Sequence, residues 1–134
     1  MRPNILFIGL GNLGSALSIK IAEANNQLII YDLNLQVRDE IEKKHPNLHA
    51  VDIPEGFSEA DVVMTCLPNS KDVQSVVDIA IRNSKNLEKI RYWIDTTSGS
   101  PKLSRQIAAQ LQEYQVDYLD CAVSGGPKGA KSGS

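Results

Sequence analysis

The sequence predicts an α/β fold in which a doubly wound, mostly parallel sheet of six strands is flanked by helices. Short apolar runs alternate with amphipathic stretches along the chain, which is the pattern of parallel strands separated by helices. With 134 residues, 42% of them hydrophobic, the chain is long enough to bury a core without disulfides or metal ions. These two observations together predict one globular α/β unit.

Six apolar runs have the length and composition of parallel strands, and most of them are apolar enough to be buried on both faces. Their boundaries are expected to hold to within about three residues. The predicted strands are Ile5–Ile8, Leu28–Tyr31, Leu48–Val51, Val62–Cys66, Tyr92–Asp95 and Val116–Leu119.

Apolar residues between these strands recur at helical spacing, and each set forms one stripe on a predicted helix. A weaker helix is predicted over Val37–Lys44, where His45 and Pro46 end it. The three clear stripes are Leu13, Leu17, Ile21 and Ala24; Val73, Val76, Val77 and Ala80; and Leu103, Ile107, Leu111 and Tyr114.

Two helix starts are marked by capping residues. Ser100 precedes Pro101, which is typical of an N-cap followed by proline at the first helical position. Asn69 or Ser70 is expected to cap the helix that contains Val73.

Composition excludes several classes of function. The 14 basic and 16 acidic residues give a net charge of −2 and are scattered along the chain, so no basic face for nucleic acid is expected. The apolar run near the N-terminus is interrupted by Gly9, Gly11, Gly14 and Lys20. It therefore predicts neither a membrane-spanning helix nor a secretion signal.

The two cysteines, Cys66 and Cys121, are too few for a disulfide framework, and this favours a reducing, cytoplasmic location. Both are interpreted as buried structural thiols. His45 and His49 flank a proline turn without metal-ligand spacing, so no metal site is expected.

The strongest local motif is a glycine loop between the first strand and the first helix. Gly9 allows a sharp turn, Gly11 allows the backbone to approach a pyrophosphate, and Gly14 allows the helix to pack closely on the strand. The diphosphate is expected at the helix N-terminus, near Leu10, Asn12 and Leu13 as well as the glycines. This strand, loop and helix indicate a Rossmann dinucleotide-binding fold, although glycine spacing alone also occurs in merely structural turns.

Asp32 ends the second apolar run, 18 residues after Gly14, close to the spacing expected for the acid that binds the ribose hydroxyls. Its charge would repel a 2′-phosphate, and Leu33 and Asn34 supply no cation, so NAD is preferred to NADP. Arg38 is expected on the exposed side of the next helix. Two alternatives remain open: Asp32 as a helix N-cap, and a methyltransferase, which also ends its second strand in an acid.

Four stretches, in order and at their spacing, resemble the β-hydroxyacid dehydrogenase family, which includes 3-hydroxyisobutyrate dehydrogenase, tartronate semialdehyde reductase and 6-phosphogluconate dehydrogenase. The resemblance covers essentially the whole chain and implies the NAD-binding domain of such an enzyme. The stretches are FIGLGNLGSAL, TCLPNSKDV, DTTSGSP and LDCAVSGGPKGA.

The resemblance implies further cofactor contacts at the ends of the fourth and fifth strands. Leu67, Pro68 and Asp72 match the residues that line the adenine and ribose side of the site, although an ordinary turn is the alternative. Ser98 matches the family's cofactor-contacting hydroxyl, and Thr97 stands where a serine usually precedes it. The alternative for Thr96 and Thr97 is hydrogen bonding directed to the backbone.

The last motif is implied to hold the substrate carboxylate through Ser124, Gly125 and Gly126. Successive small residues allow their N–H groups to converge on an anion. Ala122 replaces the proline that the family usually has, and a flexible linker without a ligand is the alternative.

These motifs predict a dinucleotide-binding domain over residues 1–123, with residues 124–134 forming the substrate loop and the start of a linker to a missing C-terminal helical domain. In the family, a lysine on that helical domain carries the proton, and Lys128 and Lys131 do not match it. We therefore expect no catalytic residue in this chain, NAD binding, and little or no activity. A homo-oligomer is possible for the full-length parent.

The resemblance implies that the parent transfers a hydride between NAD and a small 3-hydroxyacid. The substrate pair is expected to be 3-hydroxyisobutyrate and methylmalonate semialdehyde, with reduction of tartronate semialdehyde or glyoxylate as the competitor. A non-catalytic NAD-binding regulatory module is the alternative, although such a module has no need for the carboxylate-binding loop.

Overall fold

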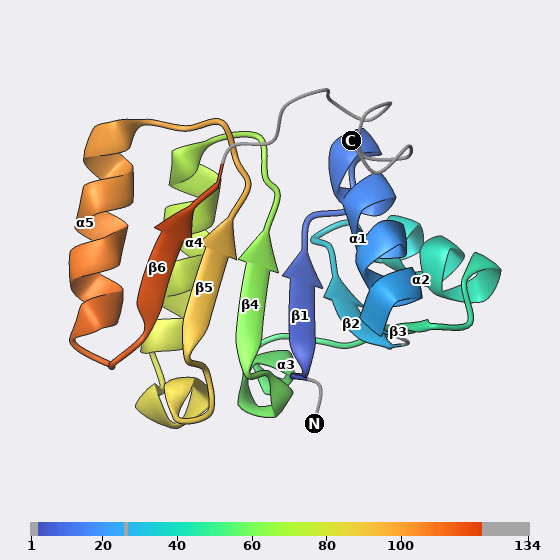
Figure 1. Cartoon of the computed structure of the whole chain (residues 1–134), viewed down its shortest axis with the longest axis horizontal. Coiled ribbons are helices and arrows are strands. Elements are labelled where there is room, and N and C mark those ends of the chain that lie inside the picture. Colours follow the sequence, from blue (N-terminus) through green and yellow to red (C-terminus); the bar gives the residue numbers. More distant parts are fainter. Residues whose placement is uncertain (1–2, 26, 122–134) are drawn as a thin grey trace.

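The computed structural model describes residues 3–25 and 27–121. Its six strands form one parallel sheet in the order β3-β2-β1-β4-β5-β6, which confirms the predicted doubly wound α/β fold (Figure 1). The strands are β1 (Ile5–Ile8), β2 (Leu28–Tyr31), β3 (Leu48–Ala50), β4 (Val62–Thr65), β5 (Tyr92–Asp95) and β6 (Asp117–Asp120). The helices are α1 (Asn12–Asn25), α2 (Leu35–Lys44), α3 (Glu55–Glu59), α4 (Ser70–Ile81), the 3-10 helix η1 (Ser84–Leu87) and α5 (Pro101–Gln112).

Alternation along the strands divides the core into two clusters, one on each face of the sheet. Phe7 and Ile30 pack with α1 and α2, whereas Leu6 and Val63 pack with α4 and α5. This division follows from the two-residue period of a strand, since neighbouring side chains point to opposite faces. On the second face Trp93 is fully buried and stacks on Phe57, with ring centroids 5.9 Å apart.

The capping residues begin and end the helices as the sequence predicts. Asn69 caps α4 by accepting from the N–H of Asp72, and Ser100 caps α5 by accepting from the N–H of Leu103. At the other end of α2, His45 is the C-cap. A side-chain acceptor at the N-cap satisfies one of the N–H groups that the first helical turn leaves without a partner.

The edge strand β6 differs from the expectation that most strands are buried on both faces. It begins and ends one residue later than predicted, and Asp117, Leu119 and Asp120 are exposed. The reason is its position at the edge of the sheet, with α5 against it and no helix in front of it in Figure 1.

The sequence did not predict the short helices α3 and η1, since five and four residues are too few to show a periodic stripe. The two helices contact each other, and η1 also contacts α4.

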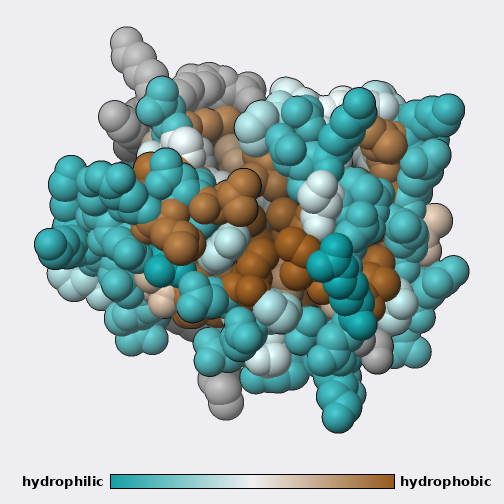
Figure 2. All heavy atoms as spheres, turned by 180° about the vertical axis from the view of Figure 1, so that it is seen from behind, coloured by the Kyte–Doolittle hydropathy of each residue, from teal (hydrophilic) through white to brown (hydrophobic). Residues whose placement is uncertain are grey.

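On the face seen from behind, hydrophobic side chains reach the surface in a patch surrounded by hydrophilic ones (Figure 2). The partly buried Ile29 and Val51 pack against the cluster of this face.

All six strands run in the same direction, so their carboxyl ends meet at one edge of the sheet. The chain leaves β1 towards β2 on one side, and β4 lies on the other side of β1. The crevice at such a switch point is where ligands bind in open parallel sheets. The loops that follow β1, β2, β4 and β5 are therefore the candidate ligand-binding loops.

Candidate functional site

The glycine loop after β1 packs so tightly that two of its three glycines leave no room for a side chain. Gly9 has φ of +106°, its N–H donates to the carbonyl of Tyr31 at 3.0 Å, and a Cβ there would strike the carbonyl of Cys66. A Cβ on Gly14 would strike the carbonyl of Gly9. These contacts are the physical reason for glycine at both positions, and they draw α1 onto the end of β1.

Gly11 is different because its side-chain direction is open. It is exposed, and a Cβ built on it would meet nothing within 4 Å. Gly11 directly precedes α1, whose exposed first residue is Asn12, with Leu13 half-buried behind it. The first turn of a helix presents N–H groups without intrahelical acceptors and the positive end of the helix dipole. An anion can therefore approach the backbone closely at this point.

Asp32, directly after β2, is bound to the same loop. One carboxylate oxygen accepts from the N–H of Leu10 at 2.7 Å, and the other accepts from the N–H of Asn34 at 2.8 Å. The alternative that Asp32 caps the next helix is wrong, because the N-cap of α2 is Asn34, which accepts from the N–H groups of Gln36 and Val37. The carboxylate is thus held beside the glycine loop by two backbone donors.

The expectation that Arg38 lies on the exposed side of its helix is also wrong. Its side chain is only 14% exposed, and its guanidinium donates to the carboxylates of Asp52 at 2.6 Å and Asp39 at 2.9 Å and to the carbonyl of Val51 at 3.1 Å. The hydrogen bonds to Asp52 and then Asp39 raise the pKa of Arg38 above its ordinary value. Tertiary contacts with the end of β3 turn the side chain inward, which helix periodicity did not reveal.

The loop after β4 is fixed by the segment after β5. The N–H of Leu67 donates to the hydroxyl oxygen of Thr97 at 2.9 Å, and Pro68 beside it is exposed. The hydroxyl of Thr96 donates to the carbonyl of Thr65 at 2.8 Å. Both threonines therefore bond to the backbone, which confirms that alternative. Asp72 is half-buried in the first turn of α4.

A buried carboxylate that the sequence did not single out organises these loops. Asp95 is 1% exposed and accepts from the hydroxyl of Thr65 at 2.9 Å, the N–H of Thr97 at 3.0 Å and the phenol of Tyr118 at 2.7 Å. It joins the carboxyl ends of β4 and β5 to Tyr118 of β6. Burial, and then the hydrogen bond to Asp95, raise the pKa of Tyr118 well above its ordinary range. The only signal in the sequence is an acid at the end of an apolar run followed by two threonines.

The remaining predicted residues divide into those at this edge and those outside the described part of the chain. Ser98 is exposed directly after the two threonines. Ser124, Gly125 and Gly126 lie outside the described residues, and their role in holding the substrate carboxylate stays a prediction. Leu33, which the sequence suggested only as a position without charge, is 88% exposed beside Asp32 and offers an apolar surface there.

The two cysteines are unpaired and differ in environment. Cys66 is half-buried at the end of β4, and burial raises the pKa of its thiol. Cys121 is exposed, so the interpretation of both as buried thiols is wrong for this residue. It directly follows the edge strand β6, and its N–H donates to the carbonyl of Asp95 at 2.7 Å.

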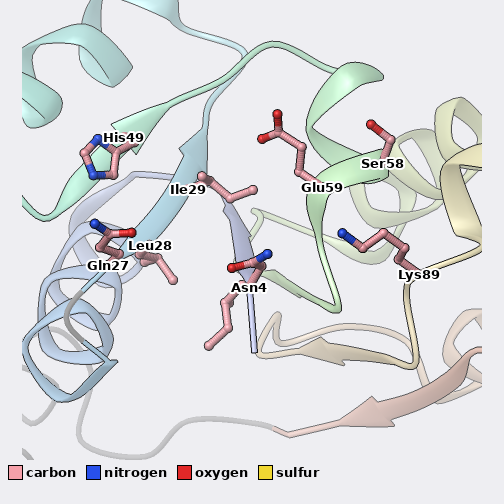
Figure 3. A pocket seen from close by; sticks show the side chains of 9 residues that line it. Asn4, Gln27, Leu28, Ile29, His49, Ser58, Glu59 and Lys89 are labelled. Atoms are coloured by element: carbon pink, nitrogen blue, oxygen red, sulfur yellow. The ribbon is translucent and has the colours of Figure 1, made fainter. Parts of the chain in front are cut away.

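A separate hollow of about 300 Å³ lies at the opposite edge of the sheet (Figure 3). Its lining includes Asn4, Leu28 and His49 near the amino ends of β1, β2 and β3, together with Glu59 and Lys89. Because the glycine loop and Asp32 follow the carboxyl ends of their strands, this hollow is not part of the candidate site.

Within residues 3–25 and 27–121, no group of three or more His, Cys, Asp or Glu residues is placed to hold a metal ion. Within the same part of the chain, no helix combines the length and the apolar character needed to cross a membrane.

Comparison with known proteins gives consistent matches. Residues 4–134 match the family described as the NAD binding domain of 6-phosphogluconate dehydrogenase. A 2-hydroxy-3-oxopropionate reductase of Escherichia coli is 33% identical over 131 residues, which cover 96% of this chain and 43% of that protein. A probable mitochondrial 3-hydroxyisobutyrate dehydrogenase of Dictyostelium discoideum is 30% identical over 128 residues, which cover 96% of this chain and 40% of that protein.

A similar solved structure is that of Mycobacterium tuberculosis 3-hydroxyisobutyrate dehydrogenase with L-serine. It superposes with a TM-score of 0.85 at 27% identity and covers 100% of this chain and 45% of that one. The chain therefore spans less than half the length of the relatives that it matches.

Proposed function

Because the chain belongs to the family of the NAD-binding domain of 6-phosphogluconate dehydrogenase, we propose that it is the cofactor-binding part of an oxidoreductase acting on a small 3-hydroxyacid. The observation that carries the proposal is the junction of Gly11, which has open space at its Cβ position, with the carboxylate of Asp32 beside the same loop. This pairing of exposed N–H groups with a neighbouring carboxylate suits the diphosphate and the ribose of NAD.

The site residues have distinct proposed roles. The N–H groups at the start of α1, from Gly11 through Asn12 and Leu13 to Gly14, bind the diphosphate. Gly9 and Leu10, whose N–H groups donate to Tyr31 and Asp32, shape the loop around it. Asp32 accepts hydrogen bonds from the ribose hydroxyls. Leu67, Pro68 and Asp72 line the adenine and ribose side, and Ser98 contacts the nicotinamide end. Their common position at the carboxyl edge of the sheet supports these assignments.

NAD, when bound, supplies the hydride acceptor or donor, whereas the protein positions it. Ser124, Gly125 and Gly126 are proposed to hold the substrate carboxylate, in a loop over residues 124–134 that follows the dinucleotide-binding domain of residues 1–123. The substrate pair is 3-hydroxyisobutyrate and methylmalonate semialdehyde, or tartronate semialdehyde or glyoxylate undergoing reduction. The names of two relatives, a 3-hydroxyisobutyrate dehydrogenase and a 2-hydroxy-3-oxopropionate reductase, support 3-hydroxyisobutyrate and tartronate semialdehyde as substrates.

We propose that the chain alone binds NAD but turns over little or no substrate. Hydride transfer from an alcohol needs a group that accepts the hydroxyl proton, and none of the residues assigned here has that role. The proton carrier and part of the pocket would come from the remaining length of the relatives, of which this chain covers about two fifths. The unpaired state of Cys66 and Cys121 supports a reducing, cytoplasmic location.

The proposal is tested by measuring the thermal shift of the purified chain with NADH, NADPH and S-adenosylmethionine. We expect NADH to raise the melting temperature most, since binding to the folded state alone stabilises it. Stabilisation by S-adenosylmethionine alone would favour a methyltransferase and reject the proposal.

Turnover of 3-hydroxyisobutyrate with NAD is measured on the same sample. A robust rate would overturn the statement that the chain is inactive alone. NAD binding without activity, both here and when the chain is joined to a helical domain from a relative, would favour the regulatory module instead.

A further inference from the structure

Four charged residues gather at the carboxyl ends of β2 and β3, beside the predicted ribose position. Arg38 is the only guanidinium among them, and it donates to the carboxylates of Asp52 and Asp39. Asp32 contributes a third carboxylate at the end of β2. Within this cluster the acids outnumber the cation, so the local potential is negative despite the arginine.

The pairing of β2 with β3 brings the segments that carry Asp32 and Asp52 to the same edge of the sheet. Ile30 of β2 pairs with Ala50 of β3, and the N–H of Val51 donates to the carbonyl of Ile30 at 3.0 Å. Asp32 and Asp52 each follow that pair by two residues, just beyond the ends of neighbouring parallel strands. The segment that carries the Arg38–Asp52 pair therefore begins beside the segment that carries the acid proposed to face the ribose.

The bonds of Arg38 also engage Nη1 and Nε, one nitrogen of each pair that could offer a phosphate two parallel donors. Nη1 donates to both Asp52 at 2.6 Å and the carbonyl of Val51 at 3.1 Å, and Nε donates to Asp39 at 2.9 Å. An arginine binds phosphate well because it offers two parallel donors to two oxygens. With Nη1 and Nε already bonded, Arg38 does not offer that geometry to a phosphate on the ribose.

We propose that Asp52 and Asp39 determine cofactor specificity by keeping Arg38 from a 2′-phosphate. This inference rests on the proposed placement of the ribose at Asp32. In this arrangement Asp32 repels the 2′-phosphate directly, and the two other acids withhold a cation that would compensate for the repulsion. Selection for NAD is thus a property of these four residues, in the segments after β2 and β3 and in α2, rather than of Asp32 alone.

Asp52 is suitable for testing this because its side chain is 72% exposed and does not fill the core. The dissociation constants of NADH and NADPH are measured by fluorescence titration for the unaltered chain, Asp52→Ala, Arg38→Ala and the double variant. Asp117→Asn, at the start of the distant strand β6, is the control for removal of one negative charge. Asp39→Ala provides a second release of Arg38 if Asp52→Ala does not fold.

We expect Asp52→Ala to tighten NADPH binding about tenfold while the NADH constant changes less than twofold. The double variant should lose this gain, and Asp117→Asn should not show it. An unchanged ratio of the two constants in folded Asp52→Ala and Asp39→Ala overturns the inference while NADH binding keeps the proposed function intact. A gain that survives in the double variant also overturns it, because Arg38 would then have no part. Failure of the unaltered chain to bind either nucleotide would instead reject the proposed function itself.

Discussion

A carboxylate oxygen of Asp32 accepts a hydrogen bond of 2.7 Å from the N–H of Leu10, 22 residues earlier in the chain. The bond joins the end of β2 to the glycine loop after β1, and the second carboxylate oxygen accepts from the N–H of Asn34. Asp32 therefore holds the loop in place. Each carboxylate oxygen keeps a further lone pair, and in the proposed function these lone pairs accept from the hydroxyls of a ribose.

Replacing Asp32 with Ala should weaken NADH binding without unfolding the protein. Hydrogen bonds to a charged group contribute about 1.5–3 kcal/mol each, which corresponds to roughly a 10- to 100-fold rise in the dissociation constant. Asp32→Asn keeps the shape of the side chain and one acceptor oxygen, so its loss of affinity for NADH should be smaller than that of Asp32→Ala. The measurement is a fluorescence titration with NADH, and equal affinities of all three proteins would contradict the assigned role.

Replacing Gly9 or Gly11 with Ala should change two different properties: Gly9→Ala should lower the stability of the fold, and Gly11→Ala should weaken NADH binding. Gly9→Ala places a Cβ against the carbonyl of Cys66 at φ of +106°, so the free energy of unfolding should fall by about 2 kcal/mol or more. The Cβ of Gly11→Ala points into open space, so the free energy of unfolding should change by less than about 0.5 kcal/mol. The dissociation constant of NADH should rise at least tenfold.

Urea unfolding and NADH titration of both glycine variants check this prediction. If Gly11→Ala binds NADH as tightly as the unaltered chain, the diphosphate does not lie against this loop.

Alkaline pH should destabilise the protein through Tyr118. Burial and the hydrogen bond to Asp95 raise the pKa of Tyr118 in the folded state above its ordinary value of about 10. A raised pKa means that the folded state favours the neutral phenol. The stabilisation of the folded state by neutral Tyr118 is therefore full below pH 10 and is lost as the pH rises towards the pKa of the folded state.

The free energy of unfolding, measured in urea from pH 8 to 11, should therefore fall more steeply in the unaltered protein than in Tyr118→Phe. The control is Tyr92→Phe, whose exposed side chain should leave the slope unchanged. Parallel curves for the unaltered protein and Tyr118→Phe would show that the Tyr118–Asp95 bond does not contribute to the pH dependence.

The two cysteines should react with iodoacetamide at different rates. Burial, the larger cause, and the charge of Asp95 both raise the pKa of Cys66, and the reactive species is the thiolate. Cys121 is exposed, so at pH 8 it should be alkylated about tenfold faster or more. Mass spectrometry of the digested protein gives both rates. In urea the rates should converge, and equal rates without urea would contradict the half-buried environment of Cys66.

Local patterns predicted most of the fold because helix and strand formation depend on residues that are near in sequence. The continuous apolar run at Ile5–Ile8 and the Ser100-Pro101 pair predict a strand and a helix start without reference to the rest of the chain. The short helices α3 and η1 escaped prediction because one turn carries too little periodicity. Exposure of β6 also escaped it, since an apolar residue such as Leu119 does not reveal which strand lies at an edge.

Only part of the candidate site could be predicted from the sequence, because several of its contacts join residues that are far apart in the chain. The spacing of the three glycines indicates a tight loop before a helix, and the structure adds the contact of Gly9 with Cys66. The inward position of Arg38 depends on Asp52, 14 residues away. The central role of Asp95 depends on Thr65, 30 residues earlier, and on Tyr118, 23 residues later.

The sequence by itself determined the six strands, the four longer helices, the caps Asn69 and Ser100 and the glycine loop, because each results from backbone preferences within a few residues. Tertiary structure alone decided that Asp32 holds Leu10, that Asp52 holds Arg38 and that Asp95 joins three strands. These bonds join segments whose proximity follows from the order β3-β2-β1-β4-β5-β6, and that order results from packing the whole sheet rather than from any one stretch of the chain.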